Sequence, residues 1–277
     1  MSRYAYLGPS GTFTEMALQD FLKPEDDTYP AVNVTAALDA VRKGNCDRAL
    51  VPIENSVEGV VARTLDELAV GEPLHIIAEN TVGVSFTLFS RENTDLKNVK
   101  TLATHPHAEA QCRNYIAKNY PQVEIIPTPS TSAAAEGLAS GQWDLAIAAP
   151  INAEKYNLKV IANNIGDNSN ARTRFVLVEK TNNLPKPTGF DRTSLAVFID
   201  QDHAGALLEI LTVFAKEKVN LTFIQSRPTG RELGHYHFII DVEGHIADAA
   251  VKNSVAGLEE ICDEVRFLGS YPRTNEK

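Results

Sequence analysis

The feature that most restricts the fold of this chain is the alternation of short apolar runs with amphipathic segments over its first two thirds. Runs such as Tyr4–Leu7 and Arg48–Ile53 have the length and composition of buried strands. Ile76–Phe89 is rich in β-branched and apolar residues and is expected to be extended. Segments between such runs, including Thr35–Arg42 and Ser132–Ser140, carry apolar residues at helical spacing. Strands that alternate with helices predict an α/β fold with a largely parallel sheet.

The order of elements changes after a polar stretch rich in Pro and Gly at residues 181–189, which indicates a domain boundary. Beyond it the pattern predicts strands and helices in the order β-α-β-β-α-β, which is typical of a ferredoxin-like unit. The expected elements are strands at Thr193–Ile199, Val219–Ser226, His235–Val242 and Glu264–Leu268, with helices at Ala204–Lys216 and Ala247–Gly257.

Charge and cysteine content exclude several classes of function. The net charge of -10 at pH 7 disfavours nucleic acid as a partner, because duplex binding needs clustered Lys and Arg. Cys46, Cys112 and Cys262 lack metal-binding spacing and are odd in number, which favours a reduced cytoplasm over a disulfide-built fold. The N-terminus does not have the pattern of a signal peptide, and no apolar run reaches membrane-spanning length. We therefore expect a cytoplasmic protein with no membrane partner.

A glycine-rich turn between a strand and a helix is the first candidate binding segment. It comprises Gly8-Pro9-Ser10-Gly11-Thr12-Phe13. Exposed backbone N–H groups at such a helix start can hold a carboxylate, and Thr12 adds a hydroxyl. The turn lacks the Lys of a phosphate-binding loop and does not follow the GxGxxG pattern. An ordinary tight turn in which Thr12 caps the helix would explain the same residues.

A polar cluster, Glu54-Asn55-Ser56, directly follows the buried strand at Arg48–Ile53. Ligands of open α/β sheets bind in the crevice beyond the carboxyl ends of the strands, so these side chains are candidates for a site. A turn that caps the next helix is an equally good explanation of the cluster.

A third candidate is Thr173-Arg174-Phe175, where polar residues lead into a Val-rich strand. Strand alternation places Thr173 and Phe175 on one face and Arg174 on the other. An arginine here could hold a carboxylate in a bidentate fork. A surface loop followed by an edge strand with solvated arginines is the alternative.

Two histidines, His105 and His107, flank Pro106 ahead of a predicted helix. His105 could act as an acid or base, but we favour a role in capping that helix. No carboxylate lies at ligand spacing from the pair, so we expect no metal. Nothing else in the sequence indicates a nucleotide or flavin cofactor.

Taken together, four segments resemble motifs of the prephenate dehydratase family, in the order of that family. They are Gly8–Phe13, Pro52–Ser56, Ser130–Ala134 and Thr173–Phe175. The resemblance covers nearly the whole chain and implies a two-lobed catalytic domain, similar in plan to periplasmic binding proteins, over residues 1–181. The first lobe would span about 1–80 and 174–181, and the second lobe about 84–165.

The resemblance also implies an activity that needs no cofactor. Prephenate would lose water and carbon dioxide to give phenylpyruvate, with the Thr173 hydroxyl donating to the leaving oxygen. The implied catalytic residues are Thr173, Asn55, Ser56 and Glu54, and the implied substrate-binding residues are Thr12, Phe13, Arg174 and Phe175, with Arg174 as the carboxylate anchor. The motifs do not separate prephenate from arogenate as the substrate. A solute-binding protein and an amino-acid-responsive regulator are the rival functions from other classes.

The C-terminal unit, residues 190–277, resembles an ACT domain. The segments similar to effector-binding motifs are Gly205-Ala206-Leu207-Leu208 and Gln225-Ser226-Arg227-Pro228. Gln225 stands where the family has Glu, so one charge is lost while an acceptor oxygen is kept. The resemblance implies feedback inhibition by L-phenylalanine, bound between the ACT domains of a homodimer or homotetramer. A dimerisation module without a ligand is the alternative.

Overall fold

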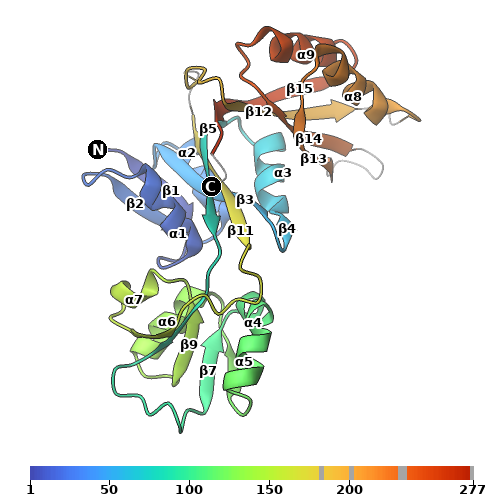
Figure 1. Cartoon of the computed structure of the whole chain (residues 1–277). Helices are drawn as coiled ribbons and strands as arrows, with labels where there is room; N and C mark the ends of the chain where they lie inside the picture. The colour runs from blue at the N-terminus through green and yellow to red at the C-terminus, as the bar shows by residue number, and fades with distance from the viewer. Residues whose placement is uncertain (181–183, 200–202, 230–235, 275–277) are drawn as a thin grey trace.

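The computed structural model describes residues 1–180, 184–199, 203–229 and 236–274. The described chain forms three bodies, each built on its own sheet, and Figure 1 shows them one above another. We call them the first lobe (residues 1–83 and 172–180), the second lobe (84–171) and the C-terminal domain (191–274). The first lobe lies in the middle, between the second lobe and the C-terminal domain.

The first lobe has a mixed sheet covered on both faces by helices. Its strands are β1 (Arg3–Leu7), β2 (Asp27–Ala31), β3 (Arg48–Asn55), β4 (Gly59–Val60), β5 (His75–Gly83) and β11 (Arg172–Glu179). Its helices are α1 (Phe13–Leu18), the 3-10 helix η1 (Gln19–Phe21), α2 (Val34–Arg42) and α3 (Ala62–Val70). The strand order is β2-β1-β3-β11-β5, with β4 also paired to β3 and β11 antiparallel to both neighbours. α1 covers one face of this sheet, and α2 and α3 cover the other.

Short polar side chains set where the first-lobe helices begin. Thr12 caps α1 by accepting a hydrogen bond from the Glu15 amide, and Asn33 caps α2 by accepting one from Ala36 at 2.8 Å. The sequence predicted a helix that begins at Thr35, but the Asn33 amide oxygen satisfies the free N–H of the first turn two residues earlier.

The second lobe has five strands and four short helices. They are β6 (Thr87–Ser90), β7 (Thr101–Thr104), β8 (Glu124–Pro127), β9 (Leu145–Ala148), β10 (Lys159–Ala162), α4 (Pro106–Gln111), α5 (Arg113–Asn119), α6 (Thr131–Ala139) and α7 (Asn152–Lys155). The strand order is β10-β6-β9-β7-β8. The extended run expected over residues 76–89 divides into β5 and β6, which belong to different sheets, because the chain leaves the first lobe there. It returns before β11 (Figure 1).

The C-terminal domain has the predicted β-α-β-β-α-β order. Its elements are β12 (Asp191–Ile199), α8 (Ala206–Glu217), β13 (Leu221–Pro228), β14 (Tyr236–Glu243), α9 (Ala249–Glu259) and β15 (Glu264–Pro272). The strand order is β13-β14-β12-β15, with all pairs antiparallel. The expected strand start at His235 lies outside the described residues. The α/β class with a ferredoxin-like C-terminal unit is thereby confirmed.

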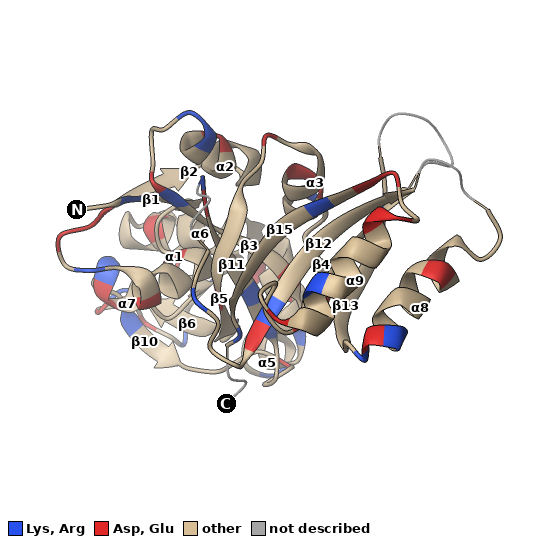
Figure 2. Cartoon of the chain, turned by 90° about the horizontal axis from the view of Figure 1, so that it is seen from above, with Lys and Arg blue, Asp and Glu red and all other residues tan. Residues whose placement is uncertain are grey.

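The two faces of the C-terminal sheet have different neighbours. α8 and α9 pack side by side on one face (Figure 2). The other face packs against the first lobe. Its residues Ala196, Ile239 and Tyr271 belong to the same hydrophobic core as α2, α3 and the first-lobe sheet. Gly269 of β15 lies so close to β5 that an added Cβ would be 2.2 Å from the Ile76 carbonyl oxygen. Only glycine permits this approach, so the C-terminal domain rests on the first lobe through a tight backbone contact.

The surface carries charges of both signs. In the view of Figure 2, Lys and Arg are interspersed with Asp and Glu. Among the described helices, none combines the length and the apolar character that crossing a membrane would need.

Candidate active site

Thr173 and Asn55 meet at the end of the first-lobe sheet nearest the second lobe (Figure 1). Thr173 is the second residue of β11, and it pairs with Asn55, the last residue of β3. The Asn55 Nδ2 donates to the Thr173 Oγ1 at 2.8 Å. Ser56 continues the ladder, because its Oγ accepts from the Arg172 amide at 2.9 Å. Three of the four predicted catalytic residues therefore lie in one contiguous group.

The Asn55 amide is held in a single orientation. Its Oδ1 accepts from the backbone N–H of Val57 at 2.8 Å and of Glu58 at 3.0 Å. These two hydrogen bonds form an Asx-turn. The turn that the sequence offered as an alternative is thus present, and it directs the NH₂ end of the amide at Thr173. The Thr173 oxygen accepts that bond, and within the described ranges its own proton has no acceptor. Thr173 can therefore donate to a bound molecule.

The pairing of β3 with β11 is irregular beside this contact. Arg174 pairs with Glu54, but the next residue, Phe175, pairs with Pro52, so β3 has one extra residue, Ile53, at this point. Such β-bulges bend a strand and redirect its side chains, and they are frequent beside active sites. The bulge therefore sets the direction in which the ends of β3 and β11 present Asn55 and Thr173.

The glycine-rich turn uses its donors internally. The Glu15 carboxylate accepts from the Ser10 hydroxyl at 2.8 Å and from the Gly11 amide at 2.5 Å. The Thr12 hydroxyl donates to the Leu7 carbonyl at 3.3 Å and caps α1. The Gly11 amide is therefore not available for a substrate carboxylate, because a carboxylate of the chain already occupies it. The capped tight turn describes it better.

The same turn is where the two lobes touch. Ser132 at the start of α6 donates to a carbonyl of the turn, and the Asn152 Nδ2 donates to the Gly11 carbonyl at 2.8 Å. The predicted substrate-binding residue Phe13 contacts Phe86 of the second lobe edge to face, with ring centroids 5.6 Å apart. Asn152 is fully buried, and no motif in the sequence had pointed to it.

His105 acts as the cap that we expected. Its Nδ1 accepts from the His107 amide at 3.2 Å at the start of α4, and burial lowers the pKa of its imidazole. The His107 ring lies 2.8 Å from the Glu58 carboxylate, which makes a second contact between the lobes. No group of three His, Cys, Asp or Glu residues suited to a metal ion occurs in the part of the chain that the structure describes.

Arg174 does not face Thr173, which corrects its assignment as the substrate anchor. Its side chain leaves the opposite face of β11 and is buried against the C-terminal domain. The guanidinium contacts the carboxylates of Glu79 and Asp241, each at 2.7 Å, and the Tyr271 hydroxyl at 2.9 Å. Three of the five N–H donors of this guanidinium are thus taken by groups of the protein, and these groups hold it on the side away from Thr173. Strand alternation had placed Arg174 on this face, but the sequence could not show what covered it.

Glu54 and Phe175 also lie apart from the Thr173 hydroxyl. The Glu54 carboxylate is on the Arg174 side, 4.0 Å from that guanidinium, since alternation turns it away from Asn55. Phe175 is buried in the core under α1, with 1% of its surface exposed. A packing role explains Phe175. Among the described residues, Glu54 has no contact that would make it a catalytic acid for Thr173.

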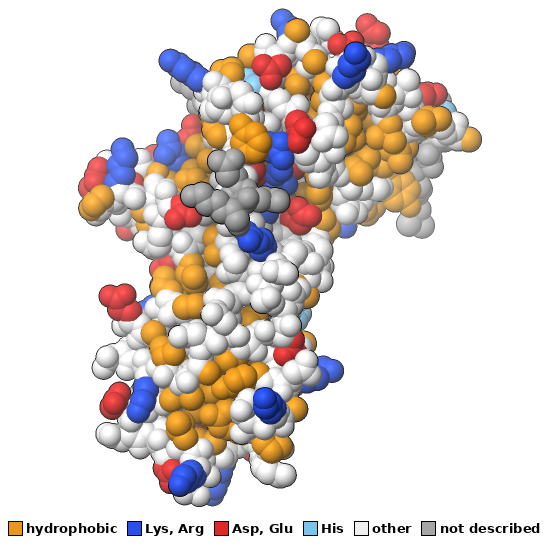
Figure 3. Space-filling model, in the orientation of Figure 1, with side chains coloured by type: hydrophobic (Ala, Val, Ile, Leu, Met, Phe, Trp, Pro, Cys, Tyr) orange, Lys and Arg blue, Asp and Glu red, His pale blue; other side chains and the backbone are white. Residues whose placement is uncertain are grey.

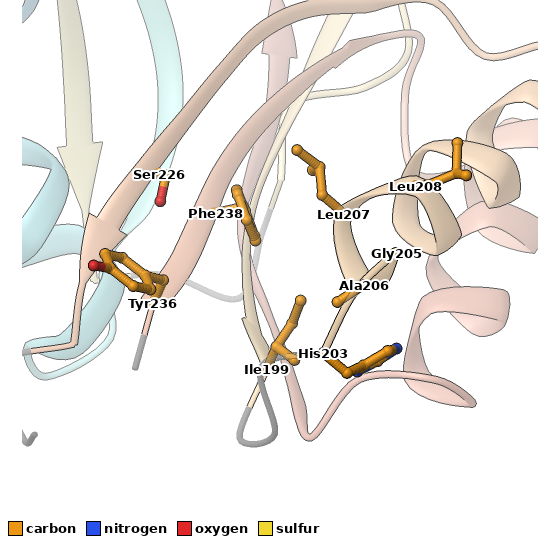
Figure 4. A pocket seen from close by; sticks show the side chains of 9 residues that line it. All are labelled: Ile199, His203, Gly205, Ala206, Leu207, Leu208, Ser226, Tyr236 and Phe238. Carbon is orange, nitrogen blue, oxygen red and sulfur yellow. The ribbon is translucent and has the colours of Figure 1, made fainter. Parts of the chain in front are cut away.

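The first predicted effector segment, Gly205–Leu208, lines a pocket in the C-terminal domain. Figure 4 shows the start of α8 facing the ends of β13 and β14 across a cavity of about 240 Å³. The lining residues are Ile199, His203, Gly205, Ala206, Leu207, Leu208, Ser226, Tyr236 and Phe238. The wall is mainly apolar with a few polar groups, and the volume lies below the roughly 300–1,000 Å³ of pockets for drug-sized ligands. The cavity therefore suits a small, partly apolar molecule.

Only part of the second predicted effector segment lines this pocket. Ser226 lines the pocket, whereas Gln225, Arg227 and Pro228 do not. Arg227 instead forms a two-pronged contact with Asp66 of α3, with Nε at 2.9 Å and Nη2 at 2.8 Å. Arg227 thus joins the C-terminal domain to the first lobe and does not line the pocket.

The fold and the site define a class of protein: a two-lobed α/β catalytic domain with a ferredoxin-like sensing domain behind it. The family model for prephenate dehydratase matches residues 4–183, and the model for the ACT domain matches residues 193–260. The chain belongs to the prephenate dehydratase family, whose members are hydro-lyases. We refer to the C-terminal domain as the ACT domain from here on.

Individual relatives agree with that assignment. A prephenate dehydratase of Amycolatopsis methanolica is 45% identical over 276 residues, which cover 99% of this chain and 90% of the relative. A solved prephenate dehydratase of Arthrobacter aurescens, in complex with L-Phe, is 46% identical with a TM-score of 0.92, over 99% of this chain and 91% of that one. A structure described as a quorum-quenching acylase has a TM-score of 0.87 but only 26% identity, over 99% and 98% of the two chains. One fold can host several activities, so the higher identity carries more weight.

Proposed function

We propose that this chain converts prephenate to phenylpyruvate, and that the Thr173 hydroxyl donates a hydrogen bond to the departing oxygen. The observation that carries the proposal is the 2.8 Å contact from the Asn55 Nδ2 to the Thr173 Oγ1. Since Asn55 donates to that oxygen, the Thr173 proton is left to point away from it, at the end of the sheet where the second lobe begins. The fixed orientation of the Asn55 amide thus supports the role proposed for Thr173.

The reaction requires the protein to hold the substrate and to donate hydrogen bonds, and little more. The prephenate dianion takes up one proton and gives the phenylpyruvate anion, carbon dioxide and water. One ring carbon–carboxylate bond and one ring carbon–oxygen bond break, and the ring becomes aromatic. A threonine hydroxyl is a weak acid, so a strong hydrogen bond to the leaving oxygen fits better than early proton transfer. Fixed donors of this kind stabilise charge as it develops.

The test is a turnover assay on the purified chain with no added metal or cofactor. Phenylpyruvate is measured by its absorbance in alkali after incubation with prephenate. A parallel reaction contains arogenate, whose dehydration product, phenylalanine, is measured by chromatography. We expect turnover of prephenate, because the relatives at 45–46% identity are prephenate dehydratases. Turnover of arogenate alone would change the assigned substrate to arogenate. No turnover of either compound would refute the proposal.

L-Phenylalanine is the effector that we propose for the cavity between α8 and β14. The solved relative from Arthrobacter aurescens was crystallised with L-Phe, and the cavity here is small and mainly apolar. Its wall begins with Gly205, whose φ of +103° belongs to the left-handed region that favours glycine. Calorimetry with L-phenylalanine, and inhibition curves of the turnover assay, test the assignment. No heat and no inhibition would leave the ACT domain as a bare assembly module.

A homodimer or homotetramer through the ACT domain is also proposed. Leu207, Leu208, Ile224 and Tyr236 are 38%, 67%, 42% and 44% exposed, and all four belong to α8, β13 or β14. Figure 3 shows apolar side chains gathered over this part of the molecule. Light scattering after size-exclusion chromatography measures the mass, and a monomer would refute the assembly. A reducing, cytoplasmic location fits the three unpaired cysteines and is likewise a proposal.

A further inference from the structure

A buried charge cluster joins the strand of the proposed catalytic threonine to the ACT sheet. Its centre is Arg174 of β11, which contacts Glu79 of β5 in the first lobe, Asp241 of β14 and Tyr271 of β15. Arg174 is 9% exposed, Glu79 8%, Asp241 1% and Tyr271 0%. Two of the three partners therefore belong to the ACT domain. Asp241 and Tyr271 are shielded from water, whereas Arg174 and Glu79 also line a cavity of about 550 Å³.

The partners of Arg174 are themselves fixed. Ser194 of β12 donates to Asp241 at 2.6 Å and shares a hydrogen bond of 2.7 Å with the Tyr271 hydroxyl. Arg192 contacts the same Glu79 oxygen at 2.7 Å, so two guanidinium groups balance the two carboxylates. A charge-balanced buried cluster tolerates little displacement of any member, because an unpaired buried charge is strongly unfavourable. The position of the Arg174 guanidinium is therefore dictated by the ACT sheet.

Arg174 is also adjacent in sequence to Thr173. The β-bulge on β3 falls between the partners of Arg174 and those of Phe175, so the first residues of β11 and the end of β3 form a short segment with its own register. The Thr173–Asn55 contact lies in that segment. A shift of the Arg174 side chain is consequently transmitted to the Thr173 hydroxyl through one peptide unit.

The other end of the cluster reaches the ACT pocket along one strand. Asp241 and the pocket residues Tyr236 and Phe238 all belong to β14. Phe238 and Asp241 are three residues apart, which is about 10 Å along a strand. A strand paired on both sides moves as a unit, and β14 is paired with β12 and β13. Filling the pocket can therefore displace Asp241 without any intermediate element.

We propose that Arg174 is a positioning residue that couples the ACT domain to catalysis. Through Asp241 and Tyr271 it sets where the Thr173 hydroxyl lies, and a ligand in the ACT pocket changes that position through β14. This role deepens the proposed function and rests on it. It also explains why an arginine beside Thr173 points away from the substrate side.

Two variants test the coupling without truncating Arg174. Asp241→Asn keeps the shape of the side chain and removes its charge, and Tyr271→Phe removes a single hydroxyl. Neither residue lines the pocket or contacts Thr173. We expect at least a threefold fall in kcat with KM within twofold of wild type. We also expect higher residual activity at saturating L-phenylalanine, while calorimetry still detects L-phenylalanine binding.

Glu67→Gln is the matched control. Glu67 contacts Arg42 at 2.7 Å, and the two side chains are 14% and 7% exposed, so this is a comparably shielded ion pair inside the first lobe. We expect the control to lose thermal stability but to keep kcat and inhibition. Equal losses of kcat or inhibition in the control and the test variants would reduce the cluster to a structural role.

The outcomes separate this proposal from the proposed function. A wild-type chain that leaves prephenate unchanged refutes the function. An active, inhibited wild type whose Tyr271→Phe and Asp241→Asn variants match it in kcat and inhibition overturns the coupling alone. Hydrogen exchange of the amides at residues 172–176 gives a readout that does not need turnover. L-Phenylalanine should change it in wild type but not in the variants, and an equal response in both would also overturn the coupling. If Asp241→Asn does not fold, Tyr271→Phe decides.

Discussion

Replacing Thr173 with valine removes one hydroxyl and leaves the shape of the side chain almost unchanged. Thr173 is 8% exposed, and its Oγ1 accepts a bond of 2.8 Å from Asn55. Valine keeps the branched Cβ that suits β11, so the strand itself should be retained. The change therefore isolates the hydrogen bond that Thr173 is proposed to donate to the leaving oxygen.

The expected loss can be worked out from that one donor. Removing a single fixed donor to a developing negative charge lowers kcat by about 10²–10³-fold, or about 2.7–4 kcal/mol. The Asn55 Nδ2 also loses its acceptor, which costs about 1 kcal/mol because Asn55 is only partly buried. In a chain of this size that corresponds to a fall in Tm of about 2–4 °C. Turnover should therefore suffer far more than stability.

The assay is steady-state turnover of prephenate by the wild type, Thr173→Val and Thr173→Ser. Loss of a bond made only in the transition state lowers kcat and kcat/KM together. Thr173→Ser keeps the hydroxyl and should retain most of the turnover. If Thr173→Val kept more than a tenth of the wild-type kcat, or raised KM alone, Thr173 would not be the donor to the leaving group.

Three further predictions concern the contact between the domains. Gly269→Ala places a Cβ 2.2 Å from the Ile76 carbonyl oxygen, so overpacking should lower the free energy of unfolding by about 1–3 kcal/mol. Denaturant titration measures this change, and an unchanged midpoint would contradict the close contact between β15 and β5. Burial lowers the pKa of His237 below its unfolded value of about 6.5, so its contribution to stability is complete above that pH and is lost as the pH falls toward the folded pKa. His237→Gln should flatten the loss of stability between pH 7.5 and 5.5, and an identical pH dependence would rule His237 out. Arg227→Ala and Asp66→Ala should weaken L-phenylalanine inhibition equally, because each breaks the contact between Arg227 and Asp66. If Arg227→Ala alone weakened inhibition, Arg227 would instead contact the ligand directly.

The order of elements could be read from the amino-acid sequence, which also pointed to the polar residues at the ends of β3 and β11. The alternating apolar runs identified the α/β body and the ferredoxin-like unit, because periodicity follows directly from which faces are buried. Sequence-based prediction was limited where one run of residues contributes to two sheets. The run over residues 76–89 forms β5 and β6, and only the packed structure shows which sheet each half joins. The pairing of Asn55 with Thr173 agreed with the family motifs, and the structure added the turn that orients the amide.

The contacts of the charged side chains, in contrast, depend on how the lobes and domains pack together. Glu15 occupies the Gly11 amide of the glycine-rich turn that was predicted to hold a carboxylate, and Arg227 contacts Asp66 of the first lobe. Arg174 shows the reason most clearly. Alternation along β11 predicts the face from which its side chain leaves, but the groups on that face come from strands up to 97 residues away in the sequence. Local pattern specifies direction, whereas the partner of a charge depends on how the ACT domain packs against the lobe.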